Sequence, residues 1–529
     1  MPGSEHNSLA CLPTLPDAPV ALIRLAQDGR VQALNRAAVD LLDLAGVDPA
    51  TLRCDCVWGL SEADLAGDEG VWVAPGADPA RRVCYQIDRD GGGWLLSLPD
   101  AASAALWRER AQPVPALPAA AGESDRAGPT LSLRGLDNLA CFRHVEGHPD
   151  TLVNDTGTGN TVACDHPFVR GLILDSLRHF VLNAGIDGFR FDLAPILGRG
   201  PHGFSAESET LQAMISDPVL SDRILIAEPW DIGPGGYQLG NFPPPFLEWN
   251  DRARDDIRRF WRGDHWTLGE LATRLTGSQD IFARHGHHRT RSVNFIAAHD
   301  GFTLMDMVSH EERHNHANGE ENRDGHHDNF SWNSGVEGAT DDPQVIEARR
   351  RDVMALLATL FASRGAIMLA MGDEAGRSQG GNNNAYCQDN EMTWLDWAGM
   401  DEGLVEYTAR LARWRKRFSV FSEYGFFVDA GDDIDWYGPS GKPVAQEDWQ
   451  QPEAAQLAVT LKTLDRQTDL VTRIAVVFNR AHREQLFTLP SRWVALDKGE
   501  EWAGMSPPRS VTFLVEDPQA GHASPVQAR

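Results

Sequence analysis

The chain has 529 residues, a length that predicts two to four domains. Its formal net charge of -28 comes from acidic residues spread along the chain, which argues against a nucleic-acid partner because such partners need a basic surface. No apolar run reaches about eighteen residues and the first residues lack a signal-peptide pattern, so neither a membrane span nor secretion is expected. The seven cysteines form no CxxC pair. Free thiols are favoured over a metal site at Cys54, Cys56 and Cys84, which fits a cytoplasmic location.

Residues 1–105 are predicted to form a small α+β module. Two apolar runs within 21–34 are joined by Asp28-Gly29, a hairpin signal. Helical spacing follows at 37–42, and three further strands are expected at 70–75, 81–89 and 93–99. This order resembles a PAS-type sensor domain, and an unrelated α+β module is the alternative. The stretch 106–127 is rich in Pro, Ala and Gly and is typical of a linker.

From about residue 165 the pattern changes to strands that alternate with helices. The segment 165–185 predicts a helix, with Asp165 as its N-cap and Gly185 just past its end. Five strands are expected in chain order, at 186–192, 223–231, 246–251, 292–301 and 366–374. Such alternation predicts parallel βα units.

Four of these five strands carry polar side chains at their C-terminal ends. These side chains are Arg190 with Asp192, Glu228, His299 with Asp300, and Asp373 with Glu374. In a (β/α)8 barrel, catalytic side chains emerge at that end. The spacing of 36 residues from Asp192 to Glu228 suits one βα unit, and the 72 residues from Glu228 to Asp300 suit two.

The C-terminal part is predicted to begin with a helix at 403–418 and to continue as a β-sandwich. The fold class is therefore α/β: a (β/α)8-type barrel represented by about strands four to eight, a C-terminal β-sandwich and a small N-terminal module. The predicted boundaries are 1–105 for the module, 106–127 for the linker, 128–400 for the barrel portion, 401–515 for the helix and sandwich, and 516–529 for a tail.

Carboxylates at the ends of several barrel strands suit glycoside hydrolysis, in which one acts as nucleophile and another as proton donor. Any one of them could instead cap the helix that follows its strand. Three carboxylates in register, two of them beside Arg or His, make capping a weaker explanation for the whole set.

The amino-acid sequences of these segments resemble those of a known family. The stretches "GFRFDLA", "AEPWD" and "AAHDG" match, in order and spacing, three of the four conserved regions of the α-amylase superfamily. The stretches "GPTLSLRGLDN", "VNDTGTGNT", "HNHANGEENRDGH" and "GNNNAYCQDNEMTWLDW" are similar to bacterial glycogen debranching enzymes of the isoamylase type. The likeness runs from about Gly128 to near the C-terminus.

The resemblance implies a retaining hydrolase that cleaves α-1,6 branch linkages of glycogen or limit dextrin. It implies that Asp192 is the nucleophile, that Glu228 is the general acid and base, and that Asp300 stabilises the transition state. Arg190 would hold Asp192 ionised and oriented, and His299 would bind sugar hydroxyls.

Five further residues near the strand ends are predicted to bind the sugar: Trp230, Asp231, Tyr237, Phe242 and Tyr386. Each aromatic residue, taken alone, could equally be rim packing. The histidines at 285–288, 314–316 and 326–327 lack fixed partners in the sequence, so no metal and no cofactor is predicted. The expected partner is a branched α-glucan, and the oligomeric state is left open.

The chain also differs from the family pattern. The family's first conserved region, Asp-x-x-x-x-Asn-His, has no counterpart before Gly128, and Ala375 stands where the family usually has phenylalanine. An open five-stranded sheet would leave strand edges unpaired. A second hypothesis is therefore a catalytically impaired glycan-binding or sensor-fused protein.

Overall fold

The computed structural model describes residues 132–427 and 433–517, together with five N-terminal strands. The chain divides into two compact units, residues 1–123 and 124–529. The first unit contains β1 (Ala21–Ala26), β2 (Val31–Leu34), β3 (Glu69–Val73), β4 (Arg82–Asp90) and β5 (Gly93–Leu98). They form one antiparallel sheet in the order β2-β1-β5-β4-β3. The strand predictions here are confirmed, whereas the predicted helix at 37–42 and the linker 106–127 lie outside the described residues.

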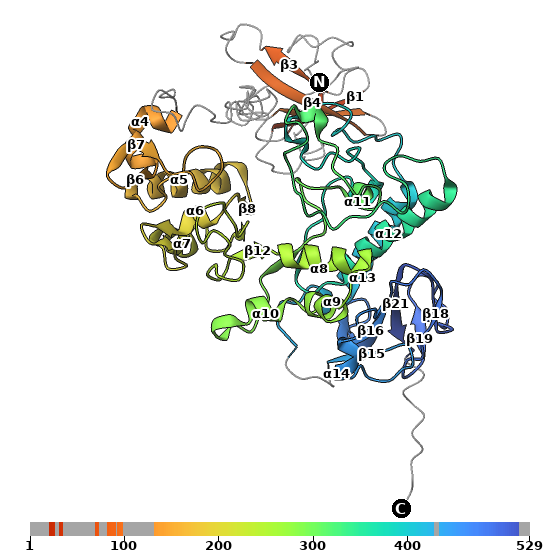
Figure 1. Cartoon of the computed structure of the whole chain (residues 1–529). Coiled ribbons are helices and arrows are strands. Elements are labelled where there is room, and N and C mark those ends of the chain that lie inside the picture. Colours follow the sequence, from red (N-terminus) through yellow and green to blue (C-terminus); the bar gives the residue numbers. More distant parts are fainter. Residues whose placement is uncertain are drawn as a thin grey trace, which may run out of the picture. The chain divides into compact units, whose positions relative to one another are not determined.

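The second unit contains a five-stranded parallel sheet in the order β14-β13-β12-β11-β8 (Figure 1). Its strands are β8 (Gly188–Phe191), β11 (Ile224–Ala227), β12 (Leu247–Trp249), β13 (Ser292–Asn294) and β14 (Ala366–Ile367). All five predicted strands are present and parallel. All five are shorter than predicted, and the last ends at Ile367 rather than at residue 374, where its pairing with β13 stops.

Helices and short strands connect and flank this sheet. Along the chain they are α4 (Ser132–Cys141), β6 (His144–Val145), β7 (His148–Leu152), α5 (Pro167–Ala184), α6 (Pro195–Gly198), β9 (Arg199–Gly200), β10 (Gly203–Phe204), α7 (Glu209–Ser216), α8 (Asp251–Arg262), α9 (Leu268–Leu275), α10 (Gln279–Phe282), α11 (Leu304–Met307), α12 (Pro343–Ala362) and α13 (Glu402–Arg417). None of the helices in the described part of the chain is long and apolar enough to cross a membrane.

The N-cap of helix α5 lies one residue later than predicted. His166, not Asp165, is the N-cap, and its Nδ1 accepts the Phe168 N–H. Asp165 instead pairs with Arg143 at 2.8 Å. The helix ends as predicted at Gly185, whose φ of 65° is readily adopted only by glycine.

The parallel sheet has two chemically different faces. Phe189 and Phe191 of β8 pack with Leu225 of β11 into a core that also contains residues of α5 and α7. Arg190 points to the other face, where its register partner is Ile226. Ile226 packs there in a second apolar cluster with Trp249, Val293 and Phe295. The alternation along β8 therefore places one guanidinium on the face opposite the helix-covered core.

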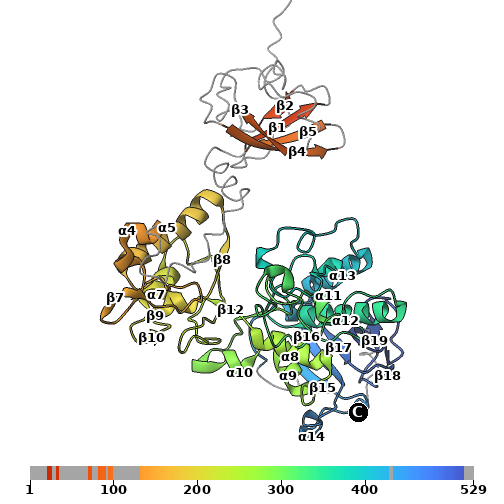
Figure 2. The ribbon, with the colours of Figure 1, turned by 45° about the horizontal axis from the view of Figure 1, so that its top comes forward.

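The C-terminal strands are β15 (Ile434–Tyr437), β16 (Gln456–Asp465), β17 (Leu470–Asn479), β18 (Gln485–Leu486), β19 (Trp493–Ala495), β20 (Met505–Ser506) and β21 (Ser510–Glu516), with the short helix α14 (Gln446–Trp449). Five of these strands form one antiparallel sheet in the order β15-β16-β17-β21-β19, and β18 pairs with β20. Figure 2 shows this part beside α8 and α9.

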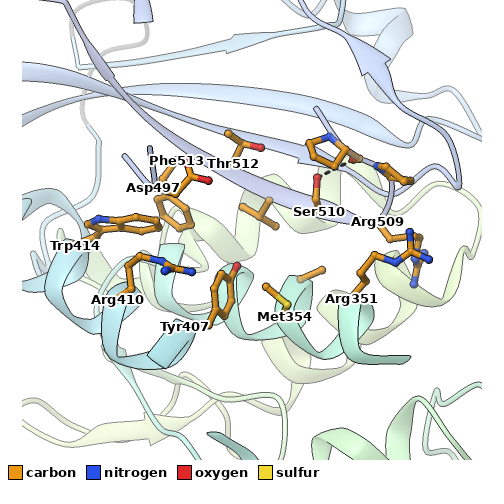
Figure 3. Close-up of a pocket in the computed structure, with 14 residues that line it drawn as sticks. Arg351, Met354, Tyr407, Arg410, Trp414, Asp497, Arg509, Ser510, Thr512 and Phe513 are labelled. Carbon is orange, nitrogen blue, oxygen red and sulfur yellow. Dashed lines mark hydrogen bonds between the residues drawn. The ribbon is translucent and has the colours of Figure 1, made fainter. Parts of the chain in front are cut away.

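One face of the C-terminal sheet packs on helices that precede it in the chain. A single core joins α8, α9, α12 and α13 with alternate residues of β16, β17 and β21. The ring of Trp414 on α13 lies 5.2 Å from that of Phe513 on β21. A pocket remains between α12, α13 and β21, lined by Met354, Tyr407 and Thr512 among others (Figure 3). The two parts thus share one hydrophobic core.

The contact between β8 and β11 leaves no room for a side chain at Gly188. A Cβ atom there would lie 2.5 Å from the backbone oxygen of Ile224. We expect Gly188→Ala to destabilise the protein by about 1–3 kcal/mol, because the neighbouring backbone must shift. Gly200→Ala is the matched control, since a Cβ at Gly200 meets nothing within 4 Å. Thermal unfolding followed by circular dichroism measures both variants, and equal melting temperatures would contradict the expected clash.

Candidate active site

Asp192 and Glu228 lie side by side because their strands are paired in register. Ala227 of β11 is paired with Phe191 of β8, so the next residue on each strand is a carboxylate. The pairing continues past the strand ends, where the Glu228 N–H donates to the Phe191 carbonyl at 3.1 Å. The Ala194 N–H donates in turn to the Glu228 carbonyl at 3.0 Å.

The guanidinium of Arg190 bridges the two carboxylates. Its Nη1 lies 2.7 Å from Asp192 Oδ1, and its Nη2 lies 2.9 Å from Glu228 Oε2. The guanidinium carbon also lies 4.3 Å from the ring centroid of Trp249, a cation–π distance. One cation therefore sets the positions of both carboxylates relative to the sheet.

Glu228 is a buried carboxyl group with a raised pKa. The pKa of Glu228 is raised to about 7, mainly by burial, and the negative charge of Asp192 acts in the same direction. The Leu193 N–H, which donates to Glu228 Oε2 at 2.8 Å, and the Arg190 cation act in the opposite direction. Leu193 has a φ of 42°, a left-handed conformation that aims this N–H at the carboxylate. Near neutral pH, Glu228 can therefore both hold and release a proton.

Asp192 has a different environment. Its side chain is 70% exposed, whereas that of Glu228 is 8% exposed. Its Oδ1 is paired with Arg190 at 2.7 Å. The two neighbouring carboxyl groups thus suit different chemical tasks.

Asp300 lies six residues beyond β13. Partial burial opposes its ionisation, but the hydrogen bond from His326 Nε2, at 3.1 Å, and the nearby charges outweigh that effect and lower the pKa of Asp300 to about 2. His299 Nδ1 lies 3.9 Å from Asp300 Oδ1. The side chain of His299 is 61% exposed, so it can also reach a ligand.

Trp249 connects the two groups of charged residues. Its ring lies under Arg190 and is 5.8 Å from the ring of His299. Helix α8 holds the backbone just before His299, because Arg258 Nε donates to the Ile296 carbonyl at 2.9 Å. The segment that carries His299 and Asp300 is thus fixed to the same sheet as Arg190.

The predicted sugar-binding residues separate into two groups. Trp230 is half-buried beside Trp249, Tyr237 is 47% exposed and donates to Asp251 Oδ1 at 2.8 Å, and Tyr386 is 70% exposed. These three keep a surface that a ligand could contact. By contrast, Asp231 is enclosed, with its side chain 0% exposed and paired with Arg199 at 2.6 Å.

Phe242 requires a correction. It is 1% exposed and packs against Phe204 and Phe246 in the core between the sheet and its helices. A sugar cannot reach this ring, so Phe242 is a core residue and is removed from the candidate set. The sequence did not reveal this because an aromatic residue after a strand end can turn either inward or outward.

Three residues at or near this site were not selected from the sequence. Trp249 is the last residue of β12, which lies between β11 and β13. Its place at a strand end could have marked it as a candidate from the sequence. His326 was noted only as part of a histidine pair. Leu193 gives no signal at all, since its role depends on a backbone conformation.

Comparison with known proteins agrees with the predicted resemblance. No protein-family model matches the chain. A protein of Mycobacterium tuberculosis described as "Glycogen operon protein GlgX homolog" is 47% identical over 336 residues, covering 62% of this chain and 47% of its own length. The "Glycogen debranching enzyme" of Serratia proteamaculans is 45% identical over 370 residues, covering 70% of this chain and 54% of its own. The "Glycogen debranching enzyme" of Cronobacter sakazakii is 48% identical over 327 residues, covering 62% of this chain and 49% of its own length.

Solved structures show the same fold. The pullulanase of Bacillus acidopullulyticus superposes with a TM-score of 0.52 at 21% identity, covering 71% of this chain and 43% of that one. The pullulanase of Paenibacillus barengoltzii in complex with maltohexaose and α-cyclodextrin gives a TM-score of 0.52 at 22% identity, covering 71% and 54%. The chain spans about half the length of the curated relatives it matches. Over the residues that these alignments cover, the chain is homologous to the bacterial glycogen debranching enzymes.

Proposed function

We propose that this protein is a glycoside hydrolase that cleaves α-1,6 branch linkages of glycogen or limit dextrin by a retaining mechanism. The observation that carries the proposal is the Arg190 bridge between an exposed carboxylate, Asp192, and a buried one, Glu228, whose pKa is raised to about 7. Retaining glycosidases need such a pair, one ionised and one protonated. The names of the homologous proteins indicate the branched glucan as substrate.

In the proposed reaction, Asp192 Oδ attacks the anomeric carbon of the sugar at the branch point. The bond to the glycosidic oxygen breaks as Glu228 donates its proton to that oxygen, leaving a β-glycosyl ester on Asp192. Glu228, now ionised, takes a proton from water, and the resulting hydroxide displaces Asp192 from the anomeric carbon. The carboxylate of Asp300, ionised with a pKa of about 2, stabilises the positive charge that develops on the ring in both steps.

Arg190 is proposed to favour the ionised form of Asp192 and to orient it. His299, Trp230, Tyr237 and Tyr386 are proposed to contact the glucan, with Asp231 holding the loop after β11 through its pair with Arg199. The five parallel strands are proposed to be part of a (β/α)8 barrel, which the likeness to the pullulanase structures supports.

We further propose that residues 1–105 form a PAS-type sensor module. The support is the five-stranded antiparallel sheet in which β1 lies between β2 and β5. This proposal is separate from the hydrolase activity of the second unit.

Replacement of the proposed nucleophile tests the hydrolase. Purified protein should release reducing ends from phosphorylase-limit glycogen, and Asp192→Asn should lower the rate by about 10³-fold or more, because the ester cannot form. Asp187→Asn is the matched control, since Asp187 is an exposed aspartate before the same strand and pairs only loosely with Arg223, at 3.6 Å. If folded wild type and Asp192→Asn release equally little sugar while both bind glycogen, the protein is a glycan-binding module and the proposal fails.

The pH dependence tests the role of Glu228. Its pKa of about 7 keeps it protonated below neutral pH, so kcat/KM should fall as the pH rises through about 7. Glu228→Gln should lower the rate by about 10²–10⁴-fold and remove this fall. Glu248→Gln is the matched control: Glu248 is also buried with a pKa of about 7, but its carboxylate pairs with Arg291. If kcat/KM of Glu228→Gln still falls as the pH rises through about 7, the group that donates the proton is not Glu228.

The dependence of kcat/KM on pH also tests the role of Arg190. Because the Arg190 cation lowers the pKa of Glu228, its replacement in Arg190→Gln should move the basic limb of kcat/KM to higher pH. The maximal rate should also fall, since Asp192 loses its partner. A reduced rate with an unmoved basic limb would show that Arg190 does not act on Glu228.

A further inference from the structure

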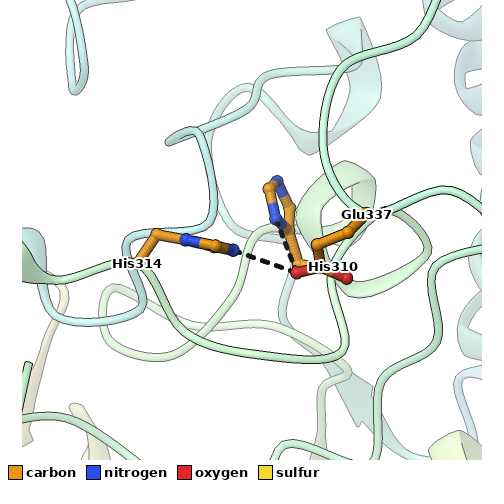
Figure 4. Close-up of side chains that lie close together, drawn as sticks. All are labelled: His310, His314 and Glu337. Carbon is orange, nitrogen blue, oxygen red and sulfur yellow. Dashed lines mark hydrogen bonds and ion pairs between the residues drawn. The ribbon is translucent and has the colours of Figure 1, made fainter.

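His310, His314 and Glu337 form a cluster in the connection between α11 and α12, outside the candidate active site. His314 Nε2 lies 3.0 Å and His310 Nδ1 lies 3.4 Å from the same oxygen, Oε1 of Glu337. Their potential ligand atoms all lie within 4.8 Å of one another. Figure 4 shows both imidazoles turned toward this one carboxylate oxygen.

The two distances from the histidine nitrogens to Glu337 Oε1 suit a tetrahedral metal ion. Zinc binds histidine nitrogen at about 2.0–2.1 Å and carboxylate oxygen at about 2.0–2.2 Å, which puts neighbouring ligand atoms roughly 3.3–3.5 Å apart. The observed separations of 3.0 and 3.4 Å are close to that range. Two imidazoles and one carboxylate are a donor set that first-row transition metals favour, and that magnesium and calcium do not.

The environment of His310 Nδ1 is a second sign of a ligand. The side chain of His310 is 8% exposed, and within the described part of the chain its buried Nδ1 makes no well-aligned hydrogen bond, although Glu337 Oε1 lies 3.4 Å away. A buried polar atom without a partner is costly. A metal ion would satisfy this atom.

The surroundings hold the three side chains in place. On the far side of the His310 ring, Nε2 faces the buried carboxylate of Asp306 at 3.8 Å, which is too long for a hydrogen bond. Glu337 Oε2 accepts from the Glu311 N–H at 2.9 Å and from Asn333 Nδ2 at 3.2 Å. Oε1 accepts from the Glu312 N–H at 3.3 Å and faces both imidazoles.

Two further features keep the space beside the cluster available. A Cβ at Gly381 would lie 2.7 Å from His310 Nδ1 and 2.7 Å from His314 Cδ2, so only glycine leaves room there. The second feature is Arg349, the nearby cation. Its guanidinium donates to the carbonyls of Asn333, Val336 and Gly338, so its N–H groups are bound by backbone oxygens.

We propose that His310, His314 and Glu337 bind a divalent transition-metal ion, with zinc as the best-fitting member of that class. The side chains of His314 and Glu337 are 42% and 36% exposed, which gives the ion a route from solvent and room for a water as fourth ligand. With these ligands the site joins two segments that are 23 residues apart, 310–314 and 337.

The bound ion stabilises a loop that reaches the candidate active site. Arg313, between the two histidine ligands, donates to the Asn322 carbonyl at 3.0 Å and to the Gly325 carbonyl at 3.2 Å. The next residue, His326, is the partner of Asp300. The ion therefore stabilises the folded loop without contacting the reacting groups.

Binding of zinc to the full chain tests the proposal. Protein treated with a chelator and then desalted should bind one Zn²⁺ per chain in titration calorimetry, and Zn²⁺ should raise its melting temperature whereas Mg²⁺ should not. X-ray absorption at the zinc edge should show two imidazole ligands. His314→Ala and Glu337→Gln change partly exposed side chains, so they are expected to fold, and each should weaken zinc binding by at least about tenfold.

Two variants of neighbouring histidines are the matched controls. His316→Ala and His288→Ala alter exposed histidines outside the cluster and should bind zinc as the wild type does. The proposal is overturned if the wild type binds no zinc, or if His314→Ala and Glu337→Gln bind it with unchanged affinity. It is also overturned if His288→Ala abolishes binding, since the zinc would then occupy another site. Each outcome is a binding measurement and is independent of hydrolase activity.

Discussion

The pairing of one guanidinium with two carboxylates is the interaction on which the candidate active site depends. Arg190 reaches both Asp192 and Glu228 because β8 and β11 are parallel and in register, and because alternation along β8 turns Arg190 away from the phenylalanine core. Its stacking on Trp249 adds a fixed apolar support. A partly buried cation is tolerated here because it is paired on two sides and stacked on a third.

The two carboxyl groups that Arg190 joins are alike in chemistry and differ in environment. Glu228 is enclosed, so water cannot stabilise its charge and its pKa rises to about 7. Asp192 is open to solvent and paired with Arg190. Asp300 is ionised for another reason, the hydrogen bond from His326. The neighbours of Glu228 and Asp300 thus shift the pKa values of these two carboxyl groups in opposite directions.

Much of this arrangement could be predicted from local sequence patterns. Apolar runs that alternate with helical segments predicted all five parallel strands, and polar residues at the strand ends predicted Arg190, Asp192 and Glu228 as neighbours. Parallel strands place such ends at one edge of a sheet, so this inference needs only strand positions. Local patterns were less successful at helix and strand ends, where His166 rather than Asp165 caps α5 and β14 ends at Ile367.

Contacts between distant segments could not be predicted in this way. The burial of Phe242, the enclosure of Asp231 by Arg199, and the position of Trp249 between Arg190 and His299 all depend on how separate βα units pack. The same holds for His310, His314 and Glu337, which three-dimensional packing brings together across 23 residues. The sequence by itself determined which residues lie at strand ends, because alternation and periodicity are local properties. Tertiary structure alone decided which of them are buried, paired or left without a partner, because desolvation and ion pairing depend on neighbours that the chain supplies from elsewhere.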